Sequence, residues 1–227
     1  MLNMDCKPAT KKWLSLLLCM SVLCLFGCSV QKTGSKMESA HAEGTWDGDS
    51  SVIERAGHEK AALRVDYLTP ASAIKSPEIF VYKEKRRLYV IQSNVLVRDY
   101  PIGLGPHPSG DKDRDGDGRT PEGDFFIIVK GSSERLKKSL AISYPGRGHA
   151  EKAYFSGVIT PLEFRDILRA ADNRSAPPSG TVLGGKIFIH AGGAHKDWTD
   201  GSIALYDSDM EELFTVASVG TPVSIRP

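Results

Sequence analysis

Hydrophobic and polar residues alternate in short runs along the chain after residue 78, as β-strands require. These runs are rich in β-branched and aromatic residues, and the polar breaks between them predict antiparallel hairpins. Residues 101–123, in contrast, are rich in turn-forming residues and have no hydrophobic period. The pattern predicts a β-rich domain with strands at 79–82, 87–92, 95–100, 125–129, 140–143, 186–190 and 222–225.

Two segments have a helical period instead, with hydrophobic residues at i, i+3, i+4 and i+7. Thr160 precedes Pro161 and Glu163, which predicts a capped helix start. Ser208 with Glu211 repeats the capping pattern before the second helix. Each helix has one hydrophobic face, which is enough to cover a sheet. The expected fold class is therefore α+β and β-rich, with a sheet curled into a sandwich or partial barrel and short helices.

The N-terminus has the features of an export signal. A basic start is followed by the uncharged run 13–27, which is shorter than the roughly 20 residues of a membrane span and typical of a signal peptide. The run ends Leu25-Phe26-Gly27-Cys28, which resembles a bacterial lipobox. Cys28 is therefore the candidate lipidation site, and the membrane is an expected partner through a lipid anchor. Phe26 is bulkier than usual there, so plain cleavage nearby stays an alternative. Ser29 favours the outer membrane.

This pattern divides the chain into a signal peptide (1–27), a polar, aperiodic segment that predicts a flexible tether (28–77) and a domain (78–227). All four cysteines lie within the first 28 residues, so the domain has no disulfide, no sulfur-ligated metal and no thiol nucleophile. The formal net charge is +1, which argues against a nucleic-acid partner. No cofactor is expected.

One stretch of the domain has the residues of nucleophilic acyl transfer. The expected strand at 186–190 delivers His190 to a glycine-rich loop, and Ser202 follows Gly201 in a tight turn twelve residues later. A strand-end histidine suits a general base, and backbone amides around Gly201 suit an oxyanion hole. The alternative is that both side chains only make local hydrogen bonds, and spacing alone favours that alternative.

The chain from about residue 78 to 227 resembles the catalytic domain of the L,D-transpeptidases. The matching stretches are RRLYVI, YPIGLG, GDGRTPEGDFFI, SYP, TVLGGKIFIHAGG, DWTDGSIAL and GTPVSI. The resemblance implies a β-sandwich-like domain that acts on peptidoglycan stem peptides outside the cytoplasm. In this family a cysteine attacks the L-centre carbonyl of a diamino acid such as meso-diaminopimelate, and the terminal D-alanine leaves. An amine of a neighbouring stem then takes the acyl group, although some members attach lipoproteins or hydrolyse instead.

The resemblance also assigns roles, with one departure at the centre. It places His190 at the position of the general base, Gly201 at the oxyanion hole, and Ser202 where the family has its nucleophilic cysteine. A serine hydroxyl is far less acidic than a thiol and has to lose its proton during the attack. Three explanations remain open: an engineered exchange, a natural silent homologue that still binds stem peptides, and a working serine enzyme. The two silent explanations together are favoured.

Further residues are expected to contact the stem peptide. They lie in the GDGRTPEG turn, around the SYP stretch and in the segment between His190 and Ser202. A solvated turn or an exposed arginine is the alternative for the first two groups. The expected substrate-binding residues are Arg119, Thr120, Tyr144, Arg147, Gly192, Trp198 and Thr199.

Residues 111–122 have the spacing of a calcium-binding EF-hand loop, with Asp111, Asp113, Asp115 and Glu122 as candidate ligands. The flanks do not fit, because prolines precede the loop and a strand follows it where the motif requires helices. A calcium loop without helices is the alternative, and we expect no metal.

Overall fold

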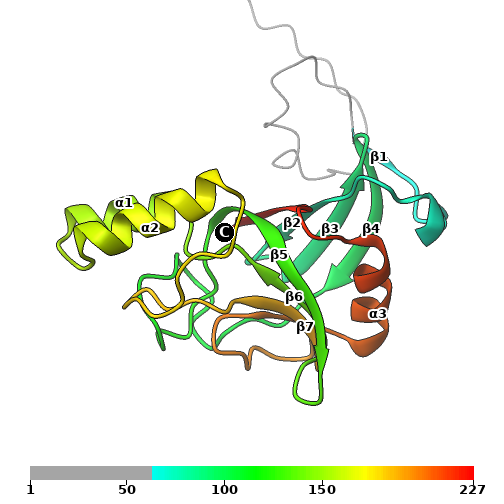
Figure 1. Ribbon diagram of the computed structural model, residues 1–227. Coiled ribbons are helices and arrows are strands. Elements are labelled where there is room, and N and C mark those ends of the chain that lie inside the picture. Colours follow the sequence, from blue (N-terminus) through cyan, green and yellow to red (C-terminus); the bar gives the residue numbers. More distant parts are fainter. Residues whose placement is uncertain (1–62) are drawn as a thin grey trace, which may run out of the picture. The chain divides into compact units, whose positions relative to one another are not determined.

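A computed structural model describes residues 63–227 (Figure 1). The expected signal peptide, Cys28 and most of the expected tether lie outside the described residues. The strands are β1 (Arg64–Val65), β2 (Glu78–Tyr82), β3 (Arg87–Gln92), β4 (Val95–Pro101), β5 (Gly123–Ser133), β6 (Lys137–Ile142), β7 (Phe188–Ala191), β8 (Ile203–Leu205) and β9 (Pro222–Arg226). The helices are the short 3-10 helix η2 (Ala71–Ala73), α1 (Arg147–Phe155), α2 (Pro161–Asp172) and α3 (Asp207–Val216).

Within residues 63–227, nine strands form one mixed sheet in the order β1-β4-β3-β2-β9-β5-β6-β7-β8. β2, β3 and β4 form the predicted antiparallel hairpins. The last strand, β9, pairs parallel with β2 and antiparallel with β5. The C-terminal end of the chain therefore joins the early hairpins to the second half of the sheet.

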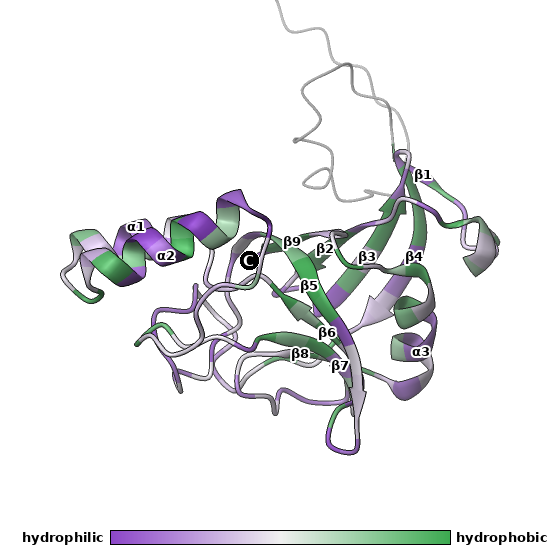
Figure 2. Cartoon of the chain, in the orientation of Figure 1, coloured by the Kyte–Doolittle hydropathy of each residue, from purple (hydrophilic) through white to green (hydrophobic). Residues whose placement is uncertain are grey.

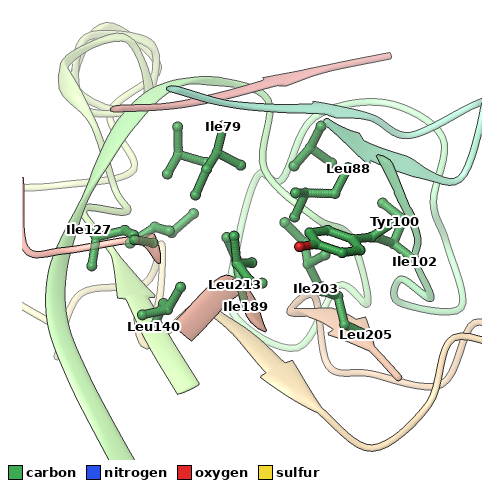
Figure 3. Packing of buried hydrophobic residues seen from close by; sticks show 14 of the residues in the cluster. Ile79, Leu88, Tyr100, Ile102, Ile127, Leu140, Ile189, Ile203, Leu205 and Leu213 are labelled. Atoms are coloured by element: carbon green, nitrogen blue, oxygen red, sulfur yellow. The ribbon is translucent and has the colours of Figure 1, made fainter. Parts of the chain in front are cut away.

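β5 makes the sheet turn. Its first residues pair with β9 and its later residues with β6, with a register shift between Ile127 and Val129. The two halves of the sheet share one core, to which Leu88 contributes from β3, Leu140 from β6 and Ile189 from β7 (Figure 3). Figure 2 shows hydrophobic residues concentrated along the central strands. Burial of each such side chain contributes about 1.5–3 kcal/mol, so the alternating pattern drives the fold. The predicted fold class, α+β and β-rich, is confirmed.

The two predicted helices are present, but only one has the predicted cap. In α2 the Thr160 hydroxyl accepts a hydrogen bond from the Glu163 amide, and the Glu163 carboxylate accepts one from the Thr160 amide. In α3 the predicted Ser208 cap is wrong, because the N-cap is Tyr206, which makes no side-chain capping bond. β8 ends at Leu205. The chain therefore enters the helix at once, and Ser208 already lies in its first turn.

α1 was not predicted, because its residues RGHAEKAYF have no continuous hydrophobic face. It packs against α2 around a second, smaller core (Figure 1). None of the helices formed by residues 63–227 is long and apolar enough to cross a membrane. The buried members of the second core are Ala150, Ala153, Ile159, Ile167 and Leu183.

The folded domain begins earlier than residue 78, so the expected end of the tether at residue 77 needs correction. β1 pairs parallel with β4. Ile74 is only 4% exposed and belongs to the main core. The Gln92 side chain accepts hydrogen bonds from the Lys75 and Ser76 amides, at 2.5 and 3.0 Å. One buried isoleucine in a polar stretch creates no periodicity, so the pattern gave no sign of this docking.

Candidate active site

The parallel pair β7 and β8 brings His190 and Ser202 to the same region. Ile189 lies opposite Ile203, and Ser202 immediately precedes β8. The Ser202 hydroxyl oxygen accepts a hydrogen bond from the Phe188 amide at 3.1 Å. Both candidate reacting residues line one pocket of about 360 Å³. The residues lining it are Asp115, Arg135, Leu136, Gly185, Lys186, Ile187, Phe188, His190, Trp198, Thr199, Asp200 and Ser202.

His190 is held as a neutral base. Its side chain is buried, and Nδ1 lies 2.6 Å from the carbonyl oxygen of Ala191. A carbonyl only accepts hydrogen bonds, so Nδ1 carries the proton and Nε2 is left as an acceptor. Burial lowers the pKa of the imidazole, the Ala191 carbonyl raises it and the charge of Arg135 lowers it, with a net decrease. The Trp198 ring packs edge-on against the imidazole, with centroids 5.5 Å apart.

The turn before β8 is held by backbone and hydroxyl hydrogen bonds. The amides of Trp198 and Thr199 both donate to the Leu104 carbonyl, at 2.8 and 3.0 Å. The Thr199 hydroxyl donates to the Ser202 carbonyl at 2.6 Å and accepts from the Gly201 amide at 3.3 Å. The Gly201 amide, predicted for the oxyanion hole, therefore has a partner already, which it has to exchange before it can bind a substrate oxygen.

Gly201 occupies a position that excludes any side chain. Its φ is +109°, and a Cβ atom there would lie 2.4 Å from the Arg119 carbonyl oxygen. Gly192 is similarly close to the Trp198 ring, at 2.9 Å from a Cβ atom to Cζ2, and its amide donates to the Asp207 carboxylate at 3.2 Å. The two glycines allow a loop and a ring to pack directly against the candidate catalytic turn.

An ion pair fixes the start of this segment. The Asp197 carboxylate accepts from the Arg86 guanidinium at 2.8 Å and from the Leu104 amide at 2.9 Å. Arg86 lies in the turn between β2 and β3 and has a φ of +52°. Because Trp198 and Thr199 directly follow Asp197, the contact from the β2–β3 turn helps to position these two residues of the pocket lining.

Tyr144 and Arg147 are expected substrate-binding residues that do not line this pocket. Tyr144 is 2% exposed, and its hydroxyl donates to the Leu183 carbonyl at 3.0 Å. Arg147 is the first residue of α1, and its guanidinium bonds to the Asp172 carboxylate of α2 at 2.5 Å. Tyr144 therefore belongs to the packing beneath the helices, and Arg147 links the two helices to each other.

Arg119 and Thr120 also lie outside the pocket lining. The Arg119 side chain makes an ion pair with Asp113 at 3.2 Å, and only its backbone carbonyl packs against Gly201. Thr120 is fully buried, its carbonyl accepts from the Lys83 ammonium at 3.0 Å, and its hydroxyl has no hydrogen-bond partner among the described residues. The Arg119 carbonyl therefore packs against the turn before β8, whereas the Thr120 carbonyl binds Lys83.

The four acidic candidates for a calcium loop do not converge. Asp111 accepts backbone hydrogen bonds from the Lys112 and Glu122 amides, both at 2.8 Å. Asp113 and Glu122 form ion pairs with lysines, the latter with the buried Lys83 at 2.7 Å. No group of three or more His, Cys, Asp or Glu side chains in residues 63–227 is arranged to hold a metal ion. The carboxylates of Asp111, Asp113 and Glu122 are instead engaged by backbone amides and by lysines.

Four charged residues of the pocket were not among the predicted substrate-binding residues: Asp115, which was considered only as a calcium ligand, and Arg135, Lys186 and Asp200. Arg135 lies in the turn between β5 and β6, far from His190 in sequence, and no motif marks it. Asp200 lies two residues before Ser202, and this closeness in sequence to the candidate nucleophile was the one sign that Asp200 could line the pocket.

The fold and the pocket define a β-rich domain in which a neutral, buried histidine and a serine face one cavity at the end of a parallel strand pair. The L,D-transpeptidase catalytic domain family, YkuD, matches residues 76–225. The chain belongs to this family of cell-wall transpeptidase-like proteins.

Solved structures of similar fold include three bacterial proteins. One is the helical cell shape determining protein Pgp2 (K307A mutant) from Campylobacter jejuni, with 19% identity, a TM-score of 0.47 and 66% of this chain against 47% of that chain covered. A second is an L,D-transpeptidase from Mycobacterium tuberculosis H37Rv, with 12% identity, a TM-score of 0.41, and coverage of 67% of this chain and 58% of that chain. The third is an L,D-transpeptidase from Mycobacterium smegmatis, with 11% identity, a TM-score of 0.40, and coverage of 67% of this chain and 59% of that chain. The chain thus spans less than two thirds of these relatives. No curated protein sequence matches it significantly.

Proposed function

We propose that this chain acts on peptidoglycan stem peptides by acyl transfer of the L,D-transpeptidase type, with Ser202 at the position of the nucleophilic cysteine. The observation that carries the proposal is the shared pocket of His190 and Ser202, at the end of a parallel strand pair within a domain of this family. The imidazole supports the proposal further, because Nε2 is left as a proton acceptor.

The reaction follows from these roles. Ser202 Oγ forms a bond to the L-centre carbonyl carbon of the third stem residue, while His190 Nε2 takes the hydroxyl proton. The bond to the terminal D-alanine then breaks, D-alanine leaves with that proton, and an ester remains on Ser202. An amine of a neighbouring stem attacks the ester, and its proton passes through His190 back to Ser202. The product is a new amide cross-link, or a shortened stem if water attacks instead.

The second candidate is a protein that binds stem peptides without reacting. Two contacts favour it. The Ser202 oxygen is engaged by the Phe188 amide, and no hydrogen bond joins Ser202 to His190 within the described residues. The Gly201 amide is engaged by Thr199. A hydroxyl also needs a better aligned base than a thiol does, since it is far less acidic.

The proposed place of action is the periplasm, with the chain tethered to a membrane through a lipid on Cys28, most simply the outer membrane. The support is the basic start, the uncharged run 13–27 and the lipobox-like end of that run. Peptidoglycan and the membrane are then its partners.

Incubation of the full chain with tetrapeptide stems, followed by mass spectrometry, tests the proposal. We expect Ser202→Cys to release D-alanine and to join stems, because a thiolate forms readily beside an imidazole. Ser202→Ala is the matched control and releases none. Release by the unaltered chain selects the serine enzyme, whereas stem binding without release selects the silent protein. If folded Ser202→Cys neither binds nor cleaves stems, the proposed function is wrong.

A further inference from the structure

The Arg86 side chain binds a carboxylate that lies 111 residues away in the chain. Its Nε atom donates to both Asp197 carboxylate oxygens at 3.2 Å, and Nη2 donates to one of them at 2.8 Å. Nη1 donates to the Lys83 carbonyl within the β2–β3 turn. The guanidinium is thus held on both sides. A two-pronged contact of this kind fixes the orientation of a carboxylate as well as its distance.

Leu104 extends this contact into the wall of the pocket. Its amide donates to the same Asp197 carboxylate at 2.9 Å. Its carbonyl accepts from the Trp198 and Thr199 amides, at 2.8 and 3.0 Å. Both main-chain polar groups of Leu104 therefore hold the segment 197–199. Because Arg86 completes the contacts of Asp197, the β2–β3 turn, Leu104 and this segment form one connected unit.

The connected unit ends at the indole of Trp198, which contacts the candidate base. The indole and the His190 imidazole pack edge to face, with an interplanar angle of 80°. The indole N–H donates to the Gly193 carbonyl at 3.0 Å, so the ring also binds the loop that follows β7. His190 is 3% exposed, whereas Trp198 is 42% exposed. The indole therefore contributes to the burial of the imidazole and has solvent on its other side.

We propose that Arg86 is a positioning residue for the candidate base: through Asp197 it holds the Trp198 indole against His190 and limits the contact of the imidazole with water. Arg86 does not line the pocket, so it acts through these two residues and not on a substrate. Without the ion pair the indole moves more freely, and the imidazole becomes better hydrated. The effect on turnover rests on the proposed function, whereas the effect on the imidazole does not.

The first test is an NMR titration of His190 in the full chain. We expect Arg86→Ala to raise the imidazole pKa by about 0.5, because a better hydrated ring carries its proton more easily. Hydrogen exchange of the Trp198 indole N–H should become faster. Arg87→Ala is the matched control, since Arg87 pairs with Asp99 at 2.6 Å and the side chains of the two ion pairs are similarly exposed, 33% and 24% against 36% and 24%. This control should change neither quantity.

Asp197→Ala separates positioning from a plain charge effect. Arg86→Ala leaves a negative charge without its partner, and Asp197→Ala leaves a positive one. An effect of charge alone therefore shifts the His190 pKa in opposite directions in the two variants. Release of the indole raises the pKa in both. Opposite shifts, or an unchanged pKa in folded Arg86→Ala, overturn the inference.

Arg86→Lys keeps the charge but not the two-pronged contact, so its pKa and indole exchange should lie between those of Arg86→Ala and the unaltered chain. If Arg86→Ala does not fold, Arg86→Lys decides: values equal to those of the unaltered chain overturn the inference.

Turnover is measured in the Ser202→Cys background with tetrapeptide stems. Arg86→Ala should lower kcat about tenfold with little change in KM, because a displaced base affects the reaction more than substrate binding. Arg87→Ala should keep both constants, and an equal loss of kcat in the two variants contradicts the assigned role of Arg86. If folded Ser202→Cys has no activity, the proposed function fails, and the titration of His190 still decides the inference.

Discussion

Replacement of Gly201 by alanine tests how tightly the turn before β8, which carries Gly201 and Ser202, is packed. The added Cβ would lie 2.4 Å from the Arg119 carbonyl oxygen, closer than Cβ atoms approach other atoms in proteins. The obstacle is backbone, so no side-chain rotation relieves it, and the two segments have to separate. The φ of +109° adds strain for any residue with a Cβ.

The size of the effect follows from a matched glycine. Gly220 has a φ of +90°, and a Cβ atom there would meet nothing within 4 Å. Gly220→Ala therefore carries only the backbone strain, about 1–3 kcal/mol. Gly201→Ala carries a similar strain plus an overpacking cost of about 1–3 kcal/mol. We expect the difference between the two variants to isolate the close approach at Gly201.

The assay is urea unfolding of both variants and of the unaltered chain, followed by circular dichroism, with the free energy of unfolding extrapolated to water. Gly201→Ala should be the less stable variant by about 1–3 kcal/mol. Equal free energies for the two variants would refute the reasoning, because they would mean that the Arg119 loop moves away without cost.

Three further predictions concern other parts of the domain. Burial raises the pKa of Asp117, but the Lys112 ammonium and backbone amides lower it further, to about 2. Because this pKa lies below the ordinary value of 3.8, the ionised Asp117 carboxylate stabilises the fold by about 2 kcal/mol above pH 4, and this contribution is lost between about pH 4 and pH 2. Urea unfolding of Asp117→Asn should lack this acid-dependent loss of stability, and an unchanged loss would contradict the assigned role of Asp117. Arg135→Ala removes a positive charge near His190 and should raise the imidazole pKa in an NMR titration, whereas a lower pKa would contradict the assigned proximity. Ile74→Ala should cost about 2–4 kcal/mol in thermal unfolding, and no loss would show that residues 63–77 do not dock.

Local chemistry explains which elements could be predicted. The hairpins from β2 to β4 follow from alternating residues, and α2 follows from the Thr160–Glu163 capping box, since both depend on neighbours a few residues apart. α1 was missed because it buries small residues and His149 without a continuous hydrophobic face. The Ser208 cap failed because β8 ends just before the helix, a fact about the sheet and not about the helix.

The candidate site residues also fall into two groups, those that the sequence could indicate and those that depend on tertiary contacts. His190 and Ser202 stand at the ends of short hydrophobic runs within matching motifs, so the sequence alone marked both as candidates. Only the pairing of β7 with β8 places them in one pocket. Tyr144 and Arg147 looked equally suitable as polar residues near a turn. They lie instead in the helix packing, because their partners, the Leu183 backbone carbonyl and the Asp172 carboxylate, come from distant parts of the chain.

The sequence by itself determined the strand periodicity, the capped helix α2 and the two candidate reacting residues, because each is encoded by residues close together in the chain. Only the tertiary structure decided which charges surround the pocket. Arg135 reaches it through the β5–β6 turn, and Asp115 reaches it from the acidic loop. Their arrangement depends on strand order and on long-range contacts such as the hydrogen bond from the Asp115 amide to the Val182 carbonyl, which no local pattern records.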